Sequence, residues 1–351
     1  MKLWKRFLAA VLVAALFMNQ PGGTVLAGAV EETAAGKWAA RDTEAAVESR
    51  LEESADRSTE KQYWYDDTEV SITFDPETGT ITAFDDPSGY LAEHEILIPE
   101  SLDGVEVLAI GDGVFANNTS LTSISGYPKI DWEYPGALCL PEGIREFGER
   151  TFYNCENLLV LSLPDNSQLT TIGDSAFENC TKLLSAFLCD ASGLQAIGNR
   201  AFANCESMDF VRFAYELQTL GEGAFSGCSS LPIAYLPDGM TSIPDALFDG
   251  CSAMEWLRLP ETVTHIGDNA LRDCSSLKYY VLGQTEGFGL TIDPATDFRL
   301  PSNLESVGTG AFQGCGALTA LAFPKTMQSI GSNAFSDCKS LSRAEIYAPN
   351  V

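Results

Sequence analysis

The stretch IGDSAFENCTKL, residues 172–183, returns as IGNRAFANCESM at residues 197–208. The shared pattern is I-G-x-x-A-F-x-x-C-x-x-L, and similar copies begin at Leu220 and Ile330. Diverged copies with the same internal spacing begin at Ile110, Phe147, Ile243, Ile266 and Val307. Nine copies with a period near 23 residues indicate a repeat array, because so short a unit cannot bury its apolar side chains alone.

Cysteines mark the period clearly. Eight of the ten occupy one position of the pattern, namely Cys155, Cys180, Cys205, Cys228, Cys251, Cys274, Cys315 and Cys338. All eight would project in the same direction into the interior, where a free cysteine behaves as a small apolar residue. Cys139 and Cys189 lie outside this row and two units apart, too far for a bridge. We therefore expect free thiols rather than disulfides.

A short apolar segment precedes each turn of the array. Residues 158–163 and 254–259 have apolar side chains at the first, fourth and sixth positions, as in a strand with one buried face. Prolines end several of these segments, because proline lacks the N–H of a strand ladder: Pro164, Pro237, Pro260 and Pro324. The residue after the Ile-Gly pair is Asp, Asn, Ser or Thr in seven copies, which predicts a helix N-cap and a short helical turn.

These features resemble the leucine-rich repeats, and more closely the BspA-like subgroup found in bacterial surface proteins. The resemblance covers residues 63–351. It implies a leucine-rich-repeat solenoid at residues 105–351, a right-handed stack of short parallel strands with short helical turns and about nine repeats. It also implies adhesion to host matrix proteins or to other bacteria.

The N-terminal third is organised differently. A basic start, an apolar run from Phe7 to Met18, and Val25 and Ala27 near its end predict a signal peptide at residues 1–27. Residues 28–62 are acidic and rich in Ala and Glu, which predicts a flexible spacer. Residues 63–104 are expected to form a β cap, with a hairpin from residues 70–74 and 79–84. We expect a secreted protein that is free or held at the cell surface.

Two regions interrupt the regular spacing, and one edge is expected to lack a cap. Insertions after Ile124 and Leu282 are expected to form loops on one rim, either as binding elements or as neutral additions. No capping segment follows the last predicted strand, residues 341–347, so a partner, a second copy or further chain would cover that edge.

Composition excludes several classes of function. The formal net charge of −28 argues against nucleic acid and against an anionic membrane surface as partner. No run of 18 apolar residues follows the predicted signal peptide, so we expect no membrane insertion of the mature chain. The chain has two histidines, His94 and His265, and no C-x-x-C pair, so metal and redox sites are not indicated. No nucleophile or phosphate-loop motif occurs. We expect no catalysis, no cofactor and no metal.

The outward surface of the strands is the best candidate for binding a ligand. The third and fifth strand positions point away from the core and align from unit to unit, and in the central units they carry aromatic residues and arginine, a combination enriched at interface centres. The candidate ligand-binding residues are Phe187, Phe210, Arg212, Tyr235, Trp256, Arg258 and Tyr279. Cross-strand packing alone also favours aromatics here. The prediction is a non-catalytic protein that binds another macromolecule in adhesion, with a glycan-binding module or a structural component of the cell envelope as alternatives.

Overall fold

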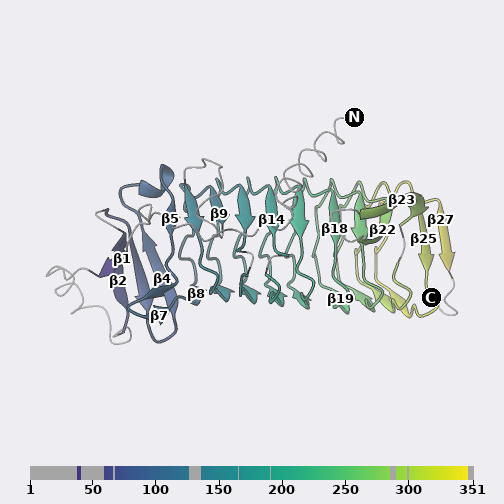
Figure 1. Cartoon of the computed structure of the whole chain (residues 1–351). Helices are drawn as coiled ribbons and strands as arrows, with labels where there is room; N and C mark the ends of the chain where they lie inside the picture. The colour runs from purple at the N-terminus through teal and green to yellow at the C-terminus, as the bar shows by residue number, and fades with distance from the viewer. Residues whose placement is uncertain are drawn as a thin grey trace, which may run out of the picture.

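The computed structural model of the chain describes residues 38–40, 59–65, 68–125, 136–164, 166–189, 191–284, 290–298 and 300–346. Figure 1 shows an elongated stack in which short strands lie side by side, with the N-terminal strands at one end and the last strand at the other. The predicted signal peptide lies outside the described residues. So does most of the predicted spacer.

An antiparallel meander begins the stack. It comprises β1 (Trp38–Ala40), β2 (Lys61–Tyr65), β3 (Ser71–Asp75) and β4 (Thr80–Asp85). The expected hairpin is confirmed as β3 and β4. However, β1 and the first two residues of β2 fall within the stretch predicted to be flexible and are paired strands instead: β1 pairs with Tyr63, Trp64 and Tyr65, and the start of β2 pairs with β3. Because β4 pairs in parallel with β8 (Ala109–Ile110), the meander covers the first repeat.

Each repeat contributes one longer and one shorter parallel strand, on two sides of the stack (Figure 1). The longer strands are β9 (Ser123–Ser125), β10 (Ala137–Cys139), β12 (Val160–Ser162), β14 (Ser185–Phe187), β16 (Phe210–Arg212), β18 (Ile233–Tyr235), β20 (Trp256–Arg258), β22 (Tyr279–Gln284), β25 (Ala320–Phe323) and β27 (Arg343–Ile346). The two-residue strand β5 (Ile96–Leu97) precedes the repeats and pairs on the same side. The shorter strands, besides β8, are β11 (Glu146–Phe147), β13 (Thr171–Ile172), β15 (Ala196–Ile197), β17 (Thr219–Leu220), β19 (Ser242–Ile243), β21 (His265–Ile266), β24 (Ser306–Val307) and β26 (Ser329–Ile330).

The described residues also form a short hairpin and a 3-10 helix. The hairpin joins β6 (Ser101–Leu102) to β7 (Val105–Glu106), and the 3-10 helix, η1, spans Tyr90–Ala92.

The two insertions add strands to the longer-strand side, beyond the loops expected there. After the first, β10 returns between β5 and β9. After the second, β23 (Leu290–Asp297) pairs antiparallel with β22. Residues 126–135 and 285–289, within the insertions, lie outside the described residues.

Phenylalanines stack along the interior, as the repeat predicts. The rings of Phe152, Phe177, Phe202 and Phe225 are fully buried, and successive centroids lie 5.0, 5.0 and 5.2 Å apart, with nearly parallel planes. The apolar strand positions are also buried, for example Leu161 and Leu257. Such burial contributes about 25 cal/mol per Å² of apolar surface. Because each ring contacts its copies above and below, a unit is stable only between neighbours.

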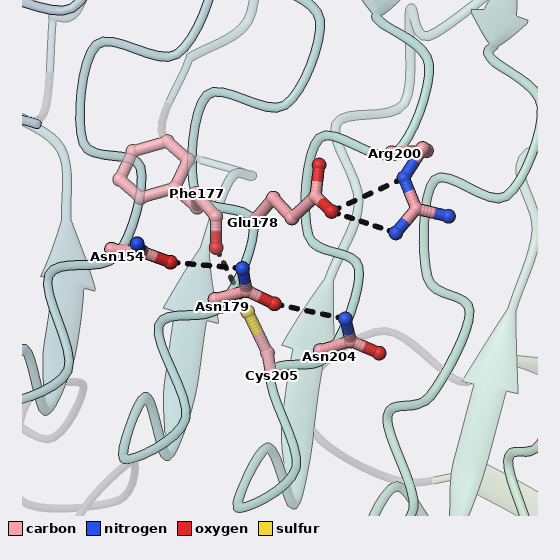
Figure 2. Close-up of polar contacts among 7 residues, drawn as sticks. All are labelled: Asn154, Phe177, Glu178, Asn179, Arg200, Asn204 and Cys205. Carbon is pink, nitrogen blue, oxygen red and sulfur yellow. Dashed lines mark hydrogen bonds and ion pairs between the residues drawn. The ribbon is translucent and has the colours of Figure 1, made fainter.

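The segment between Ile-Gly and Cys is a series of hydrogen-bonded turns rather than the predicted helical turn. Asn154, Asn179 and Asn204 have φ near +60°, and the corresponding residue is Asn, Asp or Gly in every copy. Asparagine tolerates this left-handed conformation better than most residues. Each of these asparagines donates its side-chain N–H to the amide oxygen of the previous one, at 2.8–2.9 Å between residues 154, 179 and 204 (Figure 2).

The predicted N-cap residues act between units instead. Oδ1 of Asp174 accepts the backbone N–H of Asn199 at 2.6 Å, and Oδ1 of Asp245 accepts that of Asp268 at 2.7 Å. The intervening glycine makes this approach possible, because a Cβ on Gly198 would lie 2.4 Å from Oδ1 of Asp174. The expected role as helix caps is therefore wrong. These side chains satisfy the backbone of the next unit.

Among the described residues, the eight ladder cysteines are thiols without a disulfide partner. In each ladder cysteine the thiol donates to a carbonyl of the preceding unit, for example Cys205 to Phe177 at 3.3 Å (Figure 2). Burial raises the pKa of the Cys155 and Cys228 thiols to about 12. The ladder therefore fills the core and links neighbouring units.

Two prolines interrupt both sheets at one place. In other units the residue matching Pro232 donates its N–H across the longer strands, as Asp209 does to Leu184 at 2.9 Å. The residue matching Pro244 does so across the shorter strands, as Gly221 does to Ile197 at 2.8 Å. Proline has no N–H to donate. Both sheets accordingly end at β16 and β17 and restart at β18 and β19.

The turns continue across this interruption. Phe225 still donates its backbone N–H to Leu247 at 3.0 Å, but its ring lies 6.0 Å from that of Phe248 and is tilted by 33°. Between these two units both strand ladders are interrupted, whereas the hydrogen bonds of the turns remain and the ring contact is looser. This interface is the place where we expect the stack to divide into two blocks.

We predict that alkaline pH destabilises the protein through the buried thiols. Their folded pKa exceeds the usual 9.0, so the native state retains protons that the unfolded chain releases, and stability falls as pH rises from 9 toward about 12. Cys228→Ala should reduce the slope of unfolding free energy against pH by about 1.4 kcal/mol per pH unit in this window. Equal slopes for the two proteins in urea titrations would contradict it.

We also predict that the proline pair makes unfolding stepwise. Hydrogen exchange followed by mass spectrometry at increasing urea should show strands before β18 and strands after it opening at different urea concentrations. Replacing Pro232 by Asp and Pro244 by Gly, the residues of neighbouring units, restores two donors worth about 1 kcal/mol each. The double variant should then open in one transition, and each single variant should be intermediate. A single transition in the wild type would refute this.

Candidate functional site

The candidate site is the outward side of the longer strands. We call it the strand face and define it by the partly exposed residues on β12, β14, β16, β18 and β20, which are Val160, Ser162, Ser185, Phe187, Phe210, Arg212, Ile233, Tyr235, Trp256 and Arg258. Between them lie buried residues such as Leu161 and Leu257, so the predicted alternation is present on β12, β14, β18 and β20. On β16 the intervening residue, Val211, is also partly exposed. Parallel pairing keeps equivalent positions side by side.

One half of the strand face lies before the proline interruption. Phe210 pairs with Ser185 and Arg212 with Phe187 across β14 and β16. The rings of Phe187 and Phe210 contact each other, with centroids 5.4 Å apart and planes at 43°. Beside them, Leu184 has 44% of its surface exposed, which is unusual for a large apolar side chain in this protein. This half presents apolar surface with one arginine.

The other half contains a fixed arginine. Trp256 pairs with Ile233, and Arg258 with Tyr235, across β18 and β20. The Arg258 guanidinium lies 4.5 Å from the centroid of the Tyr235 ring, donates to the Leu236 carbonyl at 3.0 Å, and forms an ion pair with Asp238. Only 12% of the Arg258 side chain is exposed. Arg258 therefore orders Tyr235 and the strand end, and its charge is already compensated.

The structure thus brings six of the seven predicted residues onto one face. The seventh, Tyr279, is on β22 with its backbone opposite Trp256, and its side chain lies outside the described residues. Sequence reasoning missed two participants, Asp238 and Leu184. The signal for Asp238 was the acidic residue directly after the proline that ends the strand. Leu184 occupies the second strand position, which the alternation does not assign to either side.

The two histidines, the side chains most suited to catalysis, each contact a residue close to them in the chain. His94 stacks on Tyr90 and its Nδ1 lies 2.9 Å from the Tyr90 carbonyl, while His265 contacts the hydroxyl of Thr264. A cavity of about 400 Å³ lies on the other side of the stack, beside the shorter strands β8 and β11, and Glu60, Asp112 and Glu146 are among its lining residues. Within the described residues no cluster of His, Cys, Asp or Glu could hold a metal ion. The described part of the chain also contains no helix that could cross a membrane.

Solved structures include similar proteins. A leucine rich cell surface protein from Faecalibacterium prausnitzii A2-165 is 27% identical, with a TM-score of 0.55, and the match covers 83% of this chain and 77% of that one. The leucine rich repeat protein of T. pallidum is 23% identical, with a TM-score of 0.40 and coverage of 77% and 87%. The pneumococcal vaccine antigen PcpA is 17% identical, with a TM-score of 0.47 and coverage of 82% and 69%. No protein of curated function matches the chain.

The repeats match a known family model. The match is to the BspA type leucine rich repeat region, in six copies, and covers residues 136–192, 189–288 and 291–350. These ranges include more than half of the chain and contain the whole strand face. The chain belongs to the family of proteins with BspA-type leucine-rich repeats.

Proposed function

We propose that this chain is an exported, non-catalytic binding protein that attaches to another protein, on a host or bacterial surface, through the strand face. The observation that carries the proposal is the row of partly exposed aromatic side chains on adjacent strands of a rigid stack. A contiguous apolar patch on the surface of a globular protein usually marks an interaction site. Aromatic and arginine side chains are also enriched among residues that dominate binding energy.

The family and the charge support this proposal. The similar protein from Faecalibacterium prausnitzii is described as a cell surface protein, which is consistent with export directed by residues 1–27. The net charge of −28 disfavours nucleic acid and anionic membranes as partners. Parallel β-strands hold the aromatic side chains at fixed spacing, so little conformational entropy is lost when a partner binds.

We predict that Trp256→Ala weakens binding roughly thirtyfold or more without unfolding the protein. Probes are purified host matrix proteins and surface extracts of other bacteria, with a glycan array in parallel. Loss of a tryptophan that anchors an interface costs about 2 kcal/mol or more, or roughly thirtyfold in affinity. The thermal midpoint should stay within about 2 °C, because Trp256 is outside the buried core.

The control is Tyr215→Ala, which removes an aromatic side chain that is 65% exposed and lies outside the strand face. It should leave affinity unchanged. Protein binding whose affinity is unchanged in Trp256→Ala would refute the proposal. Binding that is confined to glycans and lost in the same variant would replace it with a carbohydrate-binding role.

A further inference from the structure

Carboxylates line one edge of the strand face. In six consecutive units an acidic residue follows the exit of the longer strand, at positions 142, 165, 190, 216, 238 and 261. The structure describes Glu142, Glu216, Asp238 and Glu261, and all four are exposed. We call these four residues the exit row. The strand face itself contains two arginines and no carboxylate.

The exit row borders the strand face directly. Asp238 forms its ion pair with Arg258, a member of the strand face, so a carboxylate at this position is within reach of the aromatic side chains. Glu261, one unit further, accepts hydrogen bonds from the backbone N–H and the hydroxyl of Ser302, both at 2.7 Å. The strand face is therefore an apolar centre bordered on one side by fixed or exposed negative charge.

We propose that the partner of the strand face is a cationic protein surface. Its apolar side chains would pack on Phe187, Phe210 and Trp256, while its lysines and arginines lie along the exit row. This inference rests on the proposed function and adds the charge of the partner. Interfaces juxtapose opposite potentials, and a chain of net charge −28 attracts cationic partners from a distance.

The same charge argues against other occupants. A second copy of this chain would bring together two exit rows and two net charges of −28, a like-charge contact that disfavours association. A neutral glycan could stack on Trp256 but would gain nothing from the carboxylates. A cationic protein uses both the apolar centre and its border.

The test uses a phage-displayed random-peptide library selected against the full chain at low salt. Enriched peptides should combine aromatic residues with lysine or arginine, and their binding should be lost with Trp256→Ala. Glu142→Gln, Glu216→Gln and Glu261→Gln together should slow association of these peptides on the order of tenfold, and the difference should shrink as salt is added. Asp238 is left unchanged because it holds Arg258.

The matched control combines Glu146→Gln, Glu149→Gln and Glu222→Gln, which change the net charge equally but lie outside the strand face and the exit row. It should have a much smaller effect on association. Trp256-dependent peptides that are neutral or acidic, with association independent of salt and of the exit row, would overturn this inference and leave the proposed function standing. A selection that yields no Trp256-dependent peptide would overturn the proposed function itself.

Discussion

The structure depends on contact between successive turns in the interior. The rings of Phe177 and Phe202 each lie between copies in the neighbouring units, and each ladder thiol donates to the carbonyl of the preceding unit, as Cys205 does to Phe177. Asparagine amides and the Asp residues after Ile-Gly add bonds in the same direction. Almost all of these contacts join different units, so the stability of one unit is a property of its neighbours. The spacing of the stack follows from the same contacts.

The spacing between units determines how the outward side chains of the strands are arranged. Since the turns and the buried strand positions fix each unit against the next, the outward positions of β12 to β20 form a row whose members come from residues far apart in the chain. The proline interruption crosses this row between Arg212 and Tyr235, where the sheets end but the turns continue. The face thus comprises two halves, one with the Phe187–Phe210 contact and one ordered by Arg258.

Much of this could be predicted from the sequence, because the period places Phe, Cys and Leu inside and assigns alternate strand positions to the outside. The turn conformation was not predictable in the same way, since Asp and Asn favour both helix caps and left-handed turns. The acceptor role of Asp174 depends on a backbone N–H of another unit. The charge compensation of Arg258 by Asp238 likewise needs two strands in register, which spacing alone does not reveal.

The central claim is that buried rings hold the units together, and Phe202 tests it most directly. Leu271 occupies the same position in another unit and is fully buried there. Urea unfolding should therefore show that Phe202→Leu costs less than about 1.5 kcal/mol of stability, while Phe202→Ala costs about 3–5 kcal/mol. An alanine variant within about 1 kcal/mol of the wild type would contradict the account, because the stack would then not depend on its interior rings.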